Sequence, residues 1–260
     1  MGDLIEFEHI GKRFYKNGKG VQALQDVHFS VKKGEFLAVV GPSGCGKSTL
    51  LNMTAGLMAP TNGAVKYGGQ PVSAVNTAAG YVTQRDNLLP WRSVRGNVAI
   101  ALEVRGTPRS KHRQLVDDVI RNVGLTGFED HYPGELSGGM RKRVTLARTL
   151  VYSPETLLMD EPFAALDAQL KLILQGELLQ LWDAQHKTII FVTHDLSEAV
   201  TVADRVVVLS PRPSRVKLIQ EVDLPRPRDV FNIRFTERFA QISELIWAQM
   251  QEDIRKGEDV

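Results

Sequence analysis

The chain has little of what several protein classes require. One cysteine in 260 residues excludes an intramolecular disulfide framework and fits a reducing compartment. There is no run of about 18 consecutive apolar residues, so the sequence predicts no membrane-spanning helix. The 32 basic and 30 acidic residues leave a net charge of +2, which offers no bulk field for holding nucleic acid. The first residues do not resemble a secretory signal. We therefore expect a soluble, cytosolic protein with no nucleic-acid partner.

What the chain does contain is an alternation of short apolar runs and helical stretches. Strands are expected over residues 4–10, 24–31, 36–40, 64–67, 79–83, 156–159, 188–192 and 205–209. Helices are expected from residue 47 onward and over 93–103, 110–123, 140–150, 168–184 and 195–201. This alternation predicts an α/β fold with a mostly parallel sheet. The helical texture of residues 88–150 predicts a helical subdomain inserted into that core.

The last part of the chain has a different pattern. Pro225-Arg-Pro-Arg228 breaks it, and Phe235, Phe239, Ile242, Ile246 and Ile254 then recur at near-helical spacing. The pattern predicts an amphipathic helix, which either docks on its own core or binds a partner. We expect one main domain over residues 1–222 and a short helical tail over 223–260.

Gly41-Pro-Ser-Gly-Cys-Gly-Lys-Ser48 fits the pattern G-x-x-x-x-G-K-S/T and follows an apolar strand. Glycines let the backbone curl so that successive N–H groups point at phosphates, and the following helix adds its N-terminal dipole. Lys47 would supply positive charge to the phosphates, and Ser48 a hydroxyl to Mg²⁺. The sequence therefore predicts a nucleotide site formed by Gly41, Pro42, Ser43, Gly44, Cys45, Gly46, Lys47, Ser48 and Thr49.

A second apolar strand ends in two carboxylates, Asp160 and Glu161. An acid at a strand end beside a phosphate site can reach the metal, and the next one can polarise a water in line with the γ-phosphate. We assign Asp160 to Mg²⁺ and Glu161 to the general base.

Ser137-Gly138-Gly139 directly precedes a predicted helix. Ser137 could simply be the helix N-cap. Two glycines at a helix start also expose N–H groups to an anion, so both interpretations stay open on these residues alone.

In this order, the motifs resemble the ATP-binding cassette family, over residues 1 to about 222. Leu136-Ser-Gly-Gly139 is similar to the family's signature, and Gln84 stands where the family has its Q-loop glutamine. Residues 165–167 match the D-loop with Asp167, and His194 matches the switch histidine. Phe14 lies where the family stacks an aromatic ring on adenine, with Tyr15 as the fallback, although Phe14 could instead belong to the core.

The resemblance implies a fold and a mechanism. The fold would be the P-loop ATPase fold of this family: a RecA-like, mostly parallel sheet, an antiparallel β subdomain and an inserted α-helical subdomain. Two copies would form a head-to-tail homodimer with ATP between the P-loop of one and Ser137-Gly138-Gly139 of the other. Glu161, His194 and Gln84 would take part in hydrolysis. Ser48, Gln84 and Asp160 would hold Mg²⁺.

Two positions of the motifs need comment. Met140 stands where many members carry glutamine, which leaves a side-chain role there in doubt. Cys45 occupies a free position of the P-loop, and we hypothesise that alkylation of its thiol blocks hydrolysis and that ATP protects it.

The family resemblance also implies partners. A single cassette without spans resembles the ATP-hydrolysing subunit of a bacterial importer at the cytoplasmic face of the inner membrane. Its partners would be separate permease subunits and, indirectly, an extracytoplasmic solute-binding protein. Residues 87–94, 138–143, 160–167 and 210–216 resemble the nitrate, sulfonate and taurine importers. A thiamine precursor or bicarbonate is an alternative solute, and a soluble cassette ATPase acting on nucleic acid or ribosomes is an alternative class. Trp91 would dock the permease or, alternatively, pack within the helical region.

Overall fold

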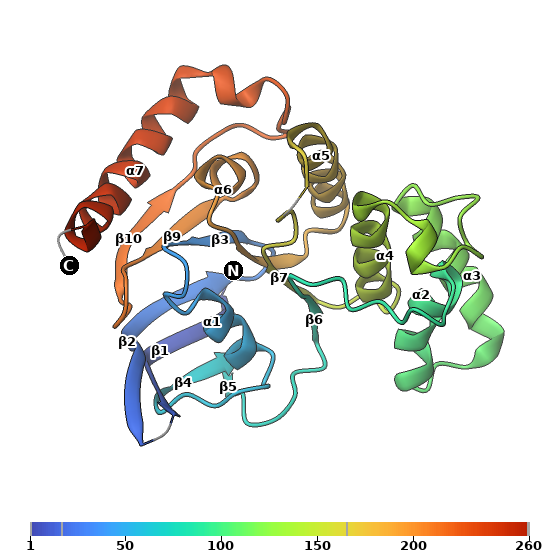
Figure 1. Ribbon diagram of the computed structural model, residues 1–260, viewed down its shortest axis with the longest axis horizontal. Coiled ribbons are helices and arrows are strands. Elements are labelled where there is room, and N and C mark those ends of the chain that lie inside the picture. The colour runs from blue at the N-terminus through green and yellow to red at the C-terminus, as the bar shows by residue number, and fades with distance from the viewer. Residues whose placement is uncertain (1, 17, 165, 259–260) are drawn as a thin grey trace.

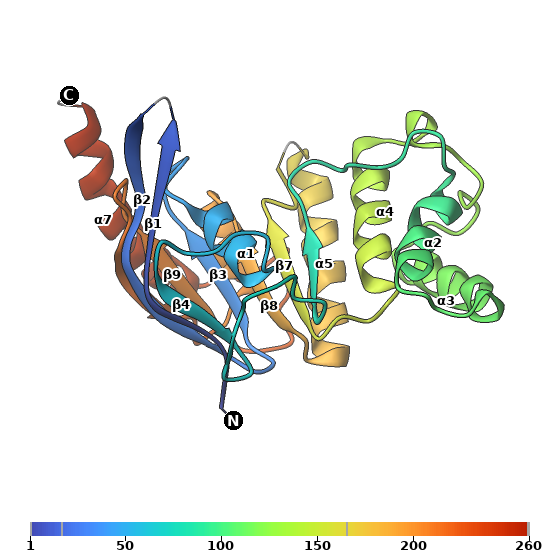
Figure 2. The ribbon, with the colours of Figure 1, turned by 90° about the horizontal axis from the view of Figure 1, so that it is seen from below.

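The computed structural model describes residues 2–16, 18–164 and 166–258, with the side chains of Lys16, Gln185 and residues 252–258 outside that description. Two sheets lie beside each other, and a lobe of helices projects from one side of them (Figures 1 and 2). In the ranges described, no helix combines the length and the apolarity needed to cross a bilayer.

The smaller sheet is antiparallel and contains both of the first strands. β1 (Asp3–Lys16) pairs with β2 (Lys19–Lys32) on one side and with β4 (Asn62–Tyr67) on the other, and β5 (Gln70–Pro71) forms the far edge. β1 and β2 are longer than the sequence predicts because their pairing continues through polar residues, as far as Lys16 opposite Lys19. β5 was not predicted, since both of its residues are exposed and carry no apolar signal.

The larger sheet is mostly parallel, as predicted. Its order is β10-β9-β3-β8-β7-β6, and only β10 runs antiparallel to its neighbour. The strands are β3 (Phe36–Val40), β6 (Ala79–Val82), β7 (Thr156–Asp160), β8 (Thr188–Val192), β9 (Arg205–Leu209) and β10 (Val216–Glu221). β10 was not predicted, because this half-buried edge strand has no long apolar run.

Both faces of β3 are buried. Phe36, Ala38 and Val40 pack in the core that contains residues of α5 (Ala168–Gln185) and α6 (Leu196–Val202). Leu37 and Val39 pack in a second core with β1, β2 and α1 (Lys47–Thr54). A continuous apolar run is therefore required here, because neighbouring side chains point to opposite cores. The loops after β3, β7 and β8 leave the sheet at one edge, where parallel strands place their carboxyl ends.

The projecting lobe contains α2 (Val94–Val104), α3 (Arg109–Asn122) and α4 (Gly138–Leu150), with a 3₁₀ turn over Pro133–Glu135 (Figure 1). Val98, Leu102, Ile120 and Val144 are buried and belong to the core that also covers one face of the larger sheet. The three helices lie at the positions that the sequence predicts, within a few residues at each end.

The tail packs on its own chain. After a 3₁₀ turn over Ile233–Phe235, α7 (Glu237–Glu258) lies against β10, β9 and α6, with Phe239, Ile242 and Ile246 buried. Phe235 was expected to belong to this apolar stripe, but it is exposed and lies before the helix. The side chain of Ile254, also expected in the stripe, lies outside the described residues. The buried Arg228 fixes the preceding segment, because its guanidinium donates to carbonyls of Val200, Thr201, Ala203 and Val222.

Candidate functional site

The loop between β3 and α1 has the shape of a phosphate-binding loop. Gly44 and Gly46 have φ of 75° and 108°, a region that favours glycine. A Cβ at Gly46 would also lie 2.6 Å from Leu24 Cδ2, so no larger residue fits the turn. The buried Lys47 donates from Nζ to the carbonyls of Gly41 at 2.8 Å and Pro42 at 3.0 Å. Its ammonium is therefore held in place by carbonyls of the phosphate-binding loop itself.

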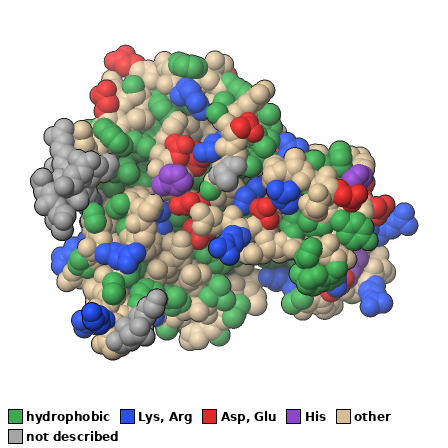
Figure 3. Space-filling view, in the orientation of Figure 1, with side chains coloured by type: hydrophobic (Ala, Val, Ile, Leu, Met, Phe, Trp, Pro, Cys, Tyr) green, Lys and Arg blue, Asp and Glu red, His purple; other side chains and the backbone are tan. Residues whose placement is uncertain are grey.

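A cleft opens over this loop. It is lined by Phe14, Ala23, Ser43, Gly44, Gly46, Lys47, Ser48, Thr49, Gln84, Glu161 and Arg212. Phe14 and six of the nine predicted phosphate-loop residues thus gather in one place, whereas Gly41, Pro42 and Cys45 do not line the cleft. Phe14 is 38% exposed, so it is not a core residue, and Tyr15 is not among the residues that line this cleft. The face of the molecule seen in Figure 3 carries charged side chains of both signs near its middle.

Asp160 lies at the end of β7 and contacts the phosphate-binding loop. Ser48 Oγ donates to Asp160 Oδ1 at 2.9 Å. Burial, with the nearby Glu161 carboxylate adding to it, raises the pKa of Asp160, although the Ser48 hydrogen bond and Lys47 act in the opposite direction. A hydroxyl and one carboxylate beside a phosphate site are the oxygen ligands that Mg²⁺ uses in nucleotide enzymes, so these residues fit that ion.

Glu161 is held by two side chains from distant parts of the chain. Gln84 Nε2 donates to Glu161 Oε2 at 3.0 Å, and His194 Nδ1 lies 3.3 Å from Oε1. The structure therefore brings together all three predicted catalytic residues. Glu161 has a φ of 46°, the left-handed region that non-glycine residues rarely adopt. Such a backbone at a functional side chain is strained, and here it directs the carboxylate towards the cleft.

The signature and D-loop residues lie outside this cleft. Ser137 is the N-cap of α4, with Oγ accepting from Met140 N at 3.3 Å, and Asp167 is the N-cap of α5, with Oδ1 accepting from Leu170 N at 2.9 Å. Gly138 and Gly139 begin α4. Ala165, the first D-loop residue, lies outside the described residues. One chain alone does not bring Ser137, Gly138, Gly139 or Asp167 to the nucleotide cleft.

Arg212 lines the cleft and was missed by the sequence reasoning. It lies in the loop after β9 and donates from Nε to the Gly44 carbonyl. Ser214 of the same loop donates from its hydroxyl to the Cys45 carbonyl, which fixes the loop against the phosphate-binding loop. No carboxylate pairs with Arg212 in the part of the chain described here. The resemblance of residues 210–216 to one importer subgroup was its only signal, because 168 residues separate Arg212 from Gly44.

The structure changes the expectation for the only cysteine. Cys45 is 1% exposed, and burial raises the pKa of its thiol. Alkylation requires an accessible thiolate, so the native chain should react slowly with or without nucleotide. The hypothesis that a thiol reagent enters this loop and that ATP blocks it is therefore not supported by the geometry.

Trp91 is displayed on the surface of the lobe and does not pack inside it. Its side chain is 72% exposed. The loop that carries it is fixed by the fully buried Asn97, whose Oδ1 accepts from Leu89 N at 2.8 Å and whose Nδ2 donates to the carbonyls of Leu89, Arg92 and Ser93. The packing interpretation of Trp91 is therefore wrong.

A second cleft lies on the same lobe between α2 and α3. It is lined by Arg95, Ala99, Glu103, Arg109, His112, Arg113, Val116 and Asp130. Charged side chains form most of its rim, with Ala99 and Val116 as apolar members. The lobe thus offers both an exposed aromatic ring and a hollow of mixed charge.

Comparison with known proteins gives one consistent result. The sequence model described as ABC transporter matches residues 24–164. An uncharacterized ABC transporter ATP-binding protein of Methanocaldococcus jannaschii is 49% identical over 93% of this chain and 91% of its own. A taurine import ATP-binding protein of Roseobacter denitrificans is 40% identical over 98% of both chains. A nitrate import ATP-binding protein of Synechococcus elongatus is 42% identical over 92% of this chain and 88% of its own.

A solved structure has the same fold. It is described as the dimeric post-hydrolysis state of an ATP-binding cassette bound to ADP and Pi. It superposes with a TM-score of 0.74 at 27% identity and covers 85% of this chain and all of its own. The mixture of a mostly parallel sheet, an antiparallel sheet and a helical lobe matches the predicted fold class.

Proposed function

The chain belongs to the ABC transporter family and is an ATPase of the ATP-binding cassette fold; from this premise we propose that it powers uptake of a small anionic solute through separate membrane subunits. The family model, the relatives above and the solved cassette with ADP and Pi carry the first part of this statement. The second part rests on relatives named for taurine and nitrate import and on the surface of the helical lobe.

In the proposed mechanism, ATP occupies the cleft over the phosphate-binding loop. Phe14 stacks on the adenine, and the loop N–H groups with Lys47 and Arg212 hold the phosphates. Water attacks the γ-phosphorus, the bond from that phosphorus to the β,γ-bridging oxygen breaks, and ADP and phosphate are formed. Glu161 takes a proton from this water, because Gln84 and His194 fix its carboxylate beside the cleft. His194 then contacts the γ-phosphate.

Mg²⁺ would be held by Ser48, Asp160 and Gln84. Two of their oxygens, Ser48 Oγ and Asp160 Oδ1, lie 2.9 Å apart. A bound Mg²⁺ would neutralise the negative charge that develops on the phosphates during hydrolysis.

We propose a dimer because the segment Ser137-Gly138-Gly139 does not reach the nucleotide cleft of its own chain. At the start of α4, Ser137 is exposed and Gly138 half-buried, and both lie away from the chain's own cleft. Such a helix N-terminus favours an anion. In a head-to-tail homodimer, the segment would close over the nucleotide of the partner, and Asp167 would lie near the same interface. The dimeric state of the solved cassette supports this arrangement.

The docking surface for the membrane subunits is proposed to be the lobe face around Trp91. An exposed tryptophan, held in place by the buried Asn97, is typical of an anchor for a partner. The neighbouring cleft between α2 and α3 could receive charged side chains of the same partner. The chain would then work as a peripheral protein at the cytoplasmic face of the bacterial inner membrane, with an extracytoplasmic binding protein delivering the solute.

One observation carries the ATPase mechanism: the Glu161 carboxylate lies between Gln84 and His194 at the edge of the cleft. Glu161→Gln keeps the shape of the side chain and removes the base. Phosphate release should fall by about 10²-fold or more, while nucleotide binding and ATP-dependent dimerisation persist. Glu244→Gln, an exposed change on α7, is the matched control and should behave as wild type. Hydrolysis at the wild-type rate in Glu161→Gln would sink the assignment.

A further inference from the structure

One face of α4 holds the segment that follows β6. Lys142 donates to the Gln84 carbonyl and pairs with Asp86 Oδ1 at 2.9 Å. The remaining contacts to the backbone of this segment come from residues spaced one helical turn apart: Thr145 donates to the Asp86 carbonyl, and Arg148 donates to the carbonyls of Asp86 and Asn87. The segment that carries Gln84 is therefore attached to α4 as well as to its own strand.

Lys142 differs from the other contacts because it binds Gln84 itself. Its side chain is only 11% exposed and its partner Asp86 is 25% exposed. Asp86 also pairs with Arg141, whose Nε lies 3.5 Å from Asp86 Oδ2, so its carboxylate keeps one cationic partner when Lys142 is removed. Among the described residues, Lys142 is the one cation on the Gln84 carbonyl.

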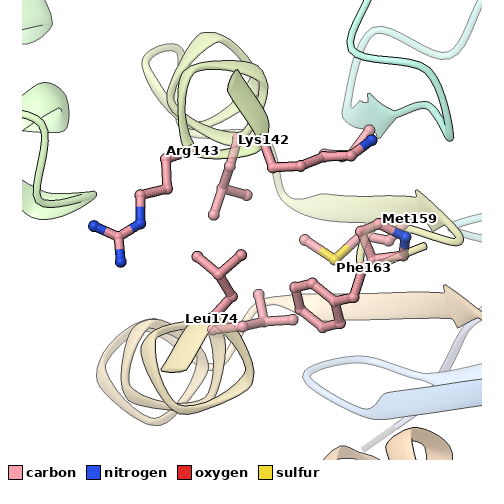
Figure 4. Close-up of a pocket in the computed structure, with 9 residues that line it drawn as sticks. Lys142, Arg143, Met159, Phe163 and Leu174 are labelled. Atoms are coloured by element: carbon pink, nitrogen blue, oxygen red, sulfur yellow. The ribbon is translucent and has the colours of Figure 1, made fainter. Parts of the chain in front are cut away.

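The next residue of α4 makes a separate contact. Arg143 Nη2 lies 2.9 Å from Glu177 Oε1 of α5. Between α4 and the core is an apolar cavity lined by Leu146, Met159, Phe163 and Leu174, with Lys142 and Arg143 at its edges (Figure 4). Val144 and Ala147 of the same helix are fully buried in the core, so packing holds α4 in place as well as these polar contacts.

We propose that Lys142 is a positioning residue for Gln84. By fixing the Gln84 carbonyl, it keeps the side-chain amide on Glu161, where Nε2 and Oε2 are 3.0 Å apart. Ser137 is the N-cap of the same helix, so a ligand that moves the start of α4 also moves Lys142. This consequence rests on the proposed function, in which the start of α4 faces the partner's nucleotide. Gln84 of one chain then responds to the nucleotide held by the other chain.

The first test is a double-mutant cycle on the full chain. Lys142→Ala should lower kcat for ATP hydrolysis by about 10-fold with KM for ATP nearly unchanged, because a catalytic side chain loses its alignment. In a Gln84→Ala background the same change should add almost nothing, since its effect passes through Gln84. Lys142→Arg should recover most of the activity, because its guanidinium can donate to the same carbonyl.

Arg143→Ala is the matched control, since it removes the same charge from the next position of α4. Its effect on kcat should be small and should multiply with that of Gln84→Ala. A Lys142→Ala effect that also multiplies in the Gln84→Ala background would overturn the proposal.

The second test does not depend on hydrolysis. Backbone hydrogen exchange over residues 83–89 should become faster in Lys142→Ala and stay as in wild type in Arg143→Ala. Unchanged exchange in Lys142→Ala contradicts the positioning role even if the chain is a fully active importer subunit. Conversely, wild-type hydrolysis by Glu161→Gln would contradict the proposed mechanism but not the role of Lys142, because the difference in hydrogen exchange would still be observed.

Discussion

At the scale of single residues, the nucleotide cleft combines side chains that the chain separates widely. Gln84 and His194 both contact the Glu161 carboxylate, and Arg212 donates to the Gly44 carbonyl of the phosphate-binding loop across 168 residues of sequence. Arg212 has no carboxylate partner in the described ranges, so its charge is available to a polyanion in the cleft. The consequence can be measured by nucleotide affinity.

Arg212→Ala should weaken ADP and ATP binding by about 10-fold, since one charged hydrogen bond to phosphate is lost. Adenosine binding should not change, because adenosine has no phosphates. Calorimetric titration of the purified chain measures all three. Arg215→Ala is the control, because it removes the same charge from the same loop at an exposed position that does not line the cleft. An equal loss for adenosine would show that Arg212 supports only the structure of the loop.

The carboxyl of Asp160 makes the free energy of unfolding depend on pH. Burial raises its pKa in the folded chain above the value in the unfolded chain. Between these two values the folded chain holds a proton that the unfolded chain has released, so the free energy of unfolding falls as pH rises through this window and stays lower above it. The ionised carboxylate thus destabilises the ligand-free chain at neutral pH.

Asp160→Asn removes this charge and should raise Tm at about pH 7 by ~2 °C, with no gain at about pH 3, where the wild-type carboxyl is protonated in both states. Thermal unfolding followed by circular dichroism at both pH values measures this. Asp229→Asn is a contrasting control, because hydrogen bonds from Asn232 and Phe231 lower the pKa of Asp229 and the change should bring no gain. A lower Tm for Asp160→Asn at neutral pH would contradict the argument.

At the scale of elements, the sequence predicted two kinds of segment: strands with a continuous apolar run, and loops that match a known motif. β3 was predicted over its full length because both of its faces are buried, and the phosphate-binding loop because its glycines are needed locally. β5 and β10 were missed because edge strands need few apolar residues. Arg212 was missed because only the folded sheet brings the loop after β9 to the loop after β3.

The loop before α2 shows the same limit. Its sequence marked Trp91 as unusual but left packing and exposure as alternatives. The deciding residue is Asn97, whose four hydrogen bonds turn the loop outwards. A buried asparagine inside a helix carries no such information in a single sequence.

Trp91→Ala should abolish most uptake of the solute while leaving ATP hydrolysis by the purified chain and its Tm within error, because the ring is exposed and contributes little to folding. Uptake of labelled taurine and nitrate by cells that depend on this chain provides the measurement. Trp247→Ala, an exposed tryptophan on α7, is the matched control. Equal loss of uptake in both variants would argue against a specific docking role for Trp91.

At the scale of the whole molecule, the proposed dimer would make each chain contribute one half to each of two different nucleotide sites. The cleft over α1 and the start of α4 are both well formed, yet they do not meet within one chain. Gly138 offers a clean probe of the second half, because a Cβ there would meet only Arg141 at 3.8 Å, whereas at Gly139 it would lie 2.3 Å from Leu170. A substitution at Gly138 should therefore leave the fold intact.

Lys47→Ala and Gly138→Asp should each remove hydrolysis when present in every chain. A mixture of the two variants should recover about a quarter of the wild-type activity, because half of the dimers are mixed and each mixed dimer has one intact site. Phosphate release at equal total concentration is the measurement, with each variant alone as the control. No recovery on mixing would mean that both halves serve one chain.

The backbone at Glu161 has a consequence for any attempt to improve this protein. Its φ of 46° lies in a region that glycine adopts without steric cost, and glycine has no side chain that could act as a base. A library of variants selected only for heat resistance would therefore tend to replace Glu161 and to lose turnover. Selection for durability and selection for turnover act in opposite directions at this one position, so stabilising changes should be sought away from it.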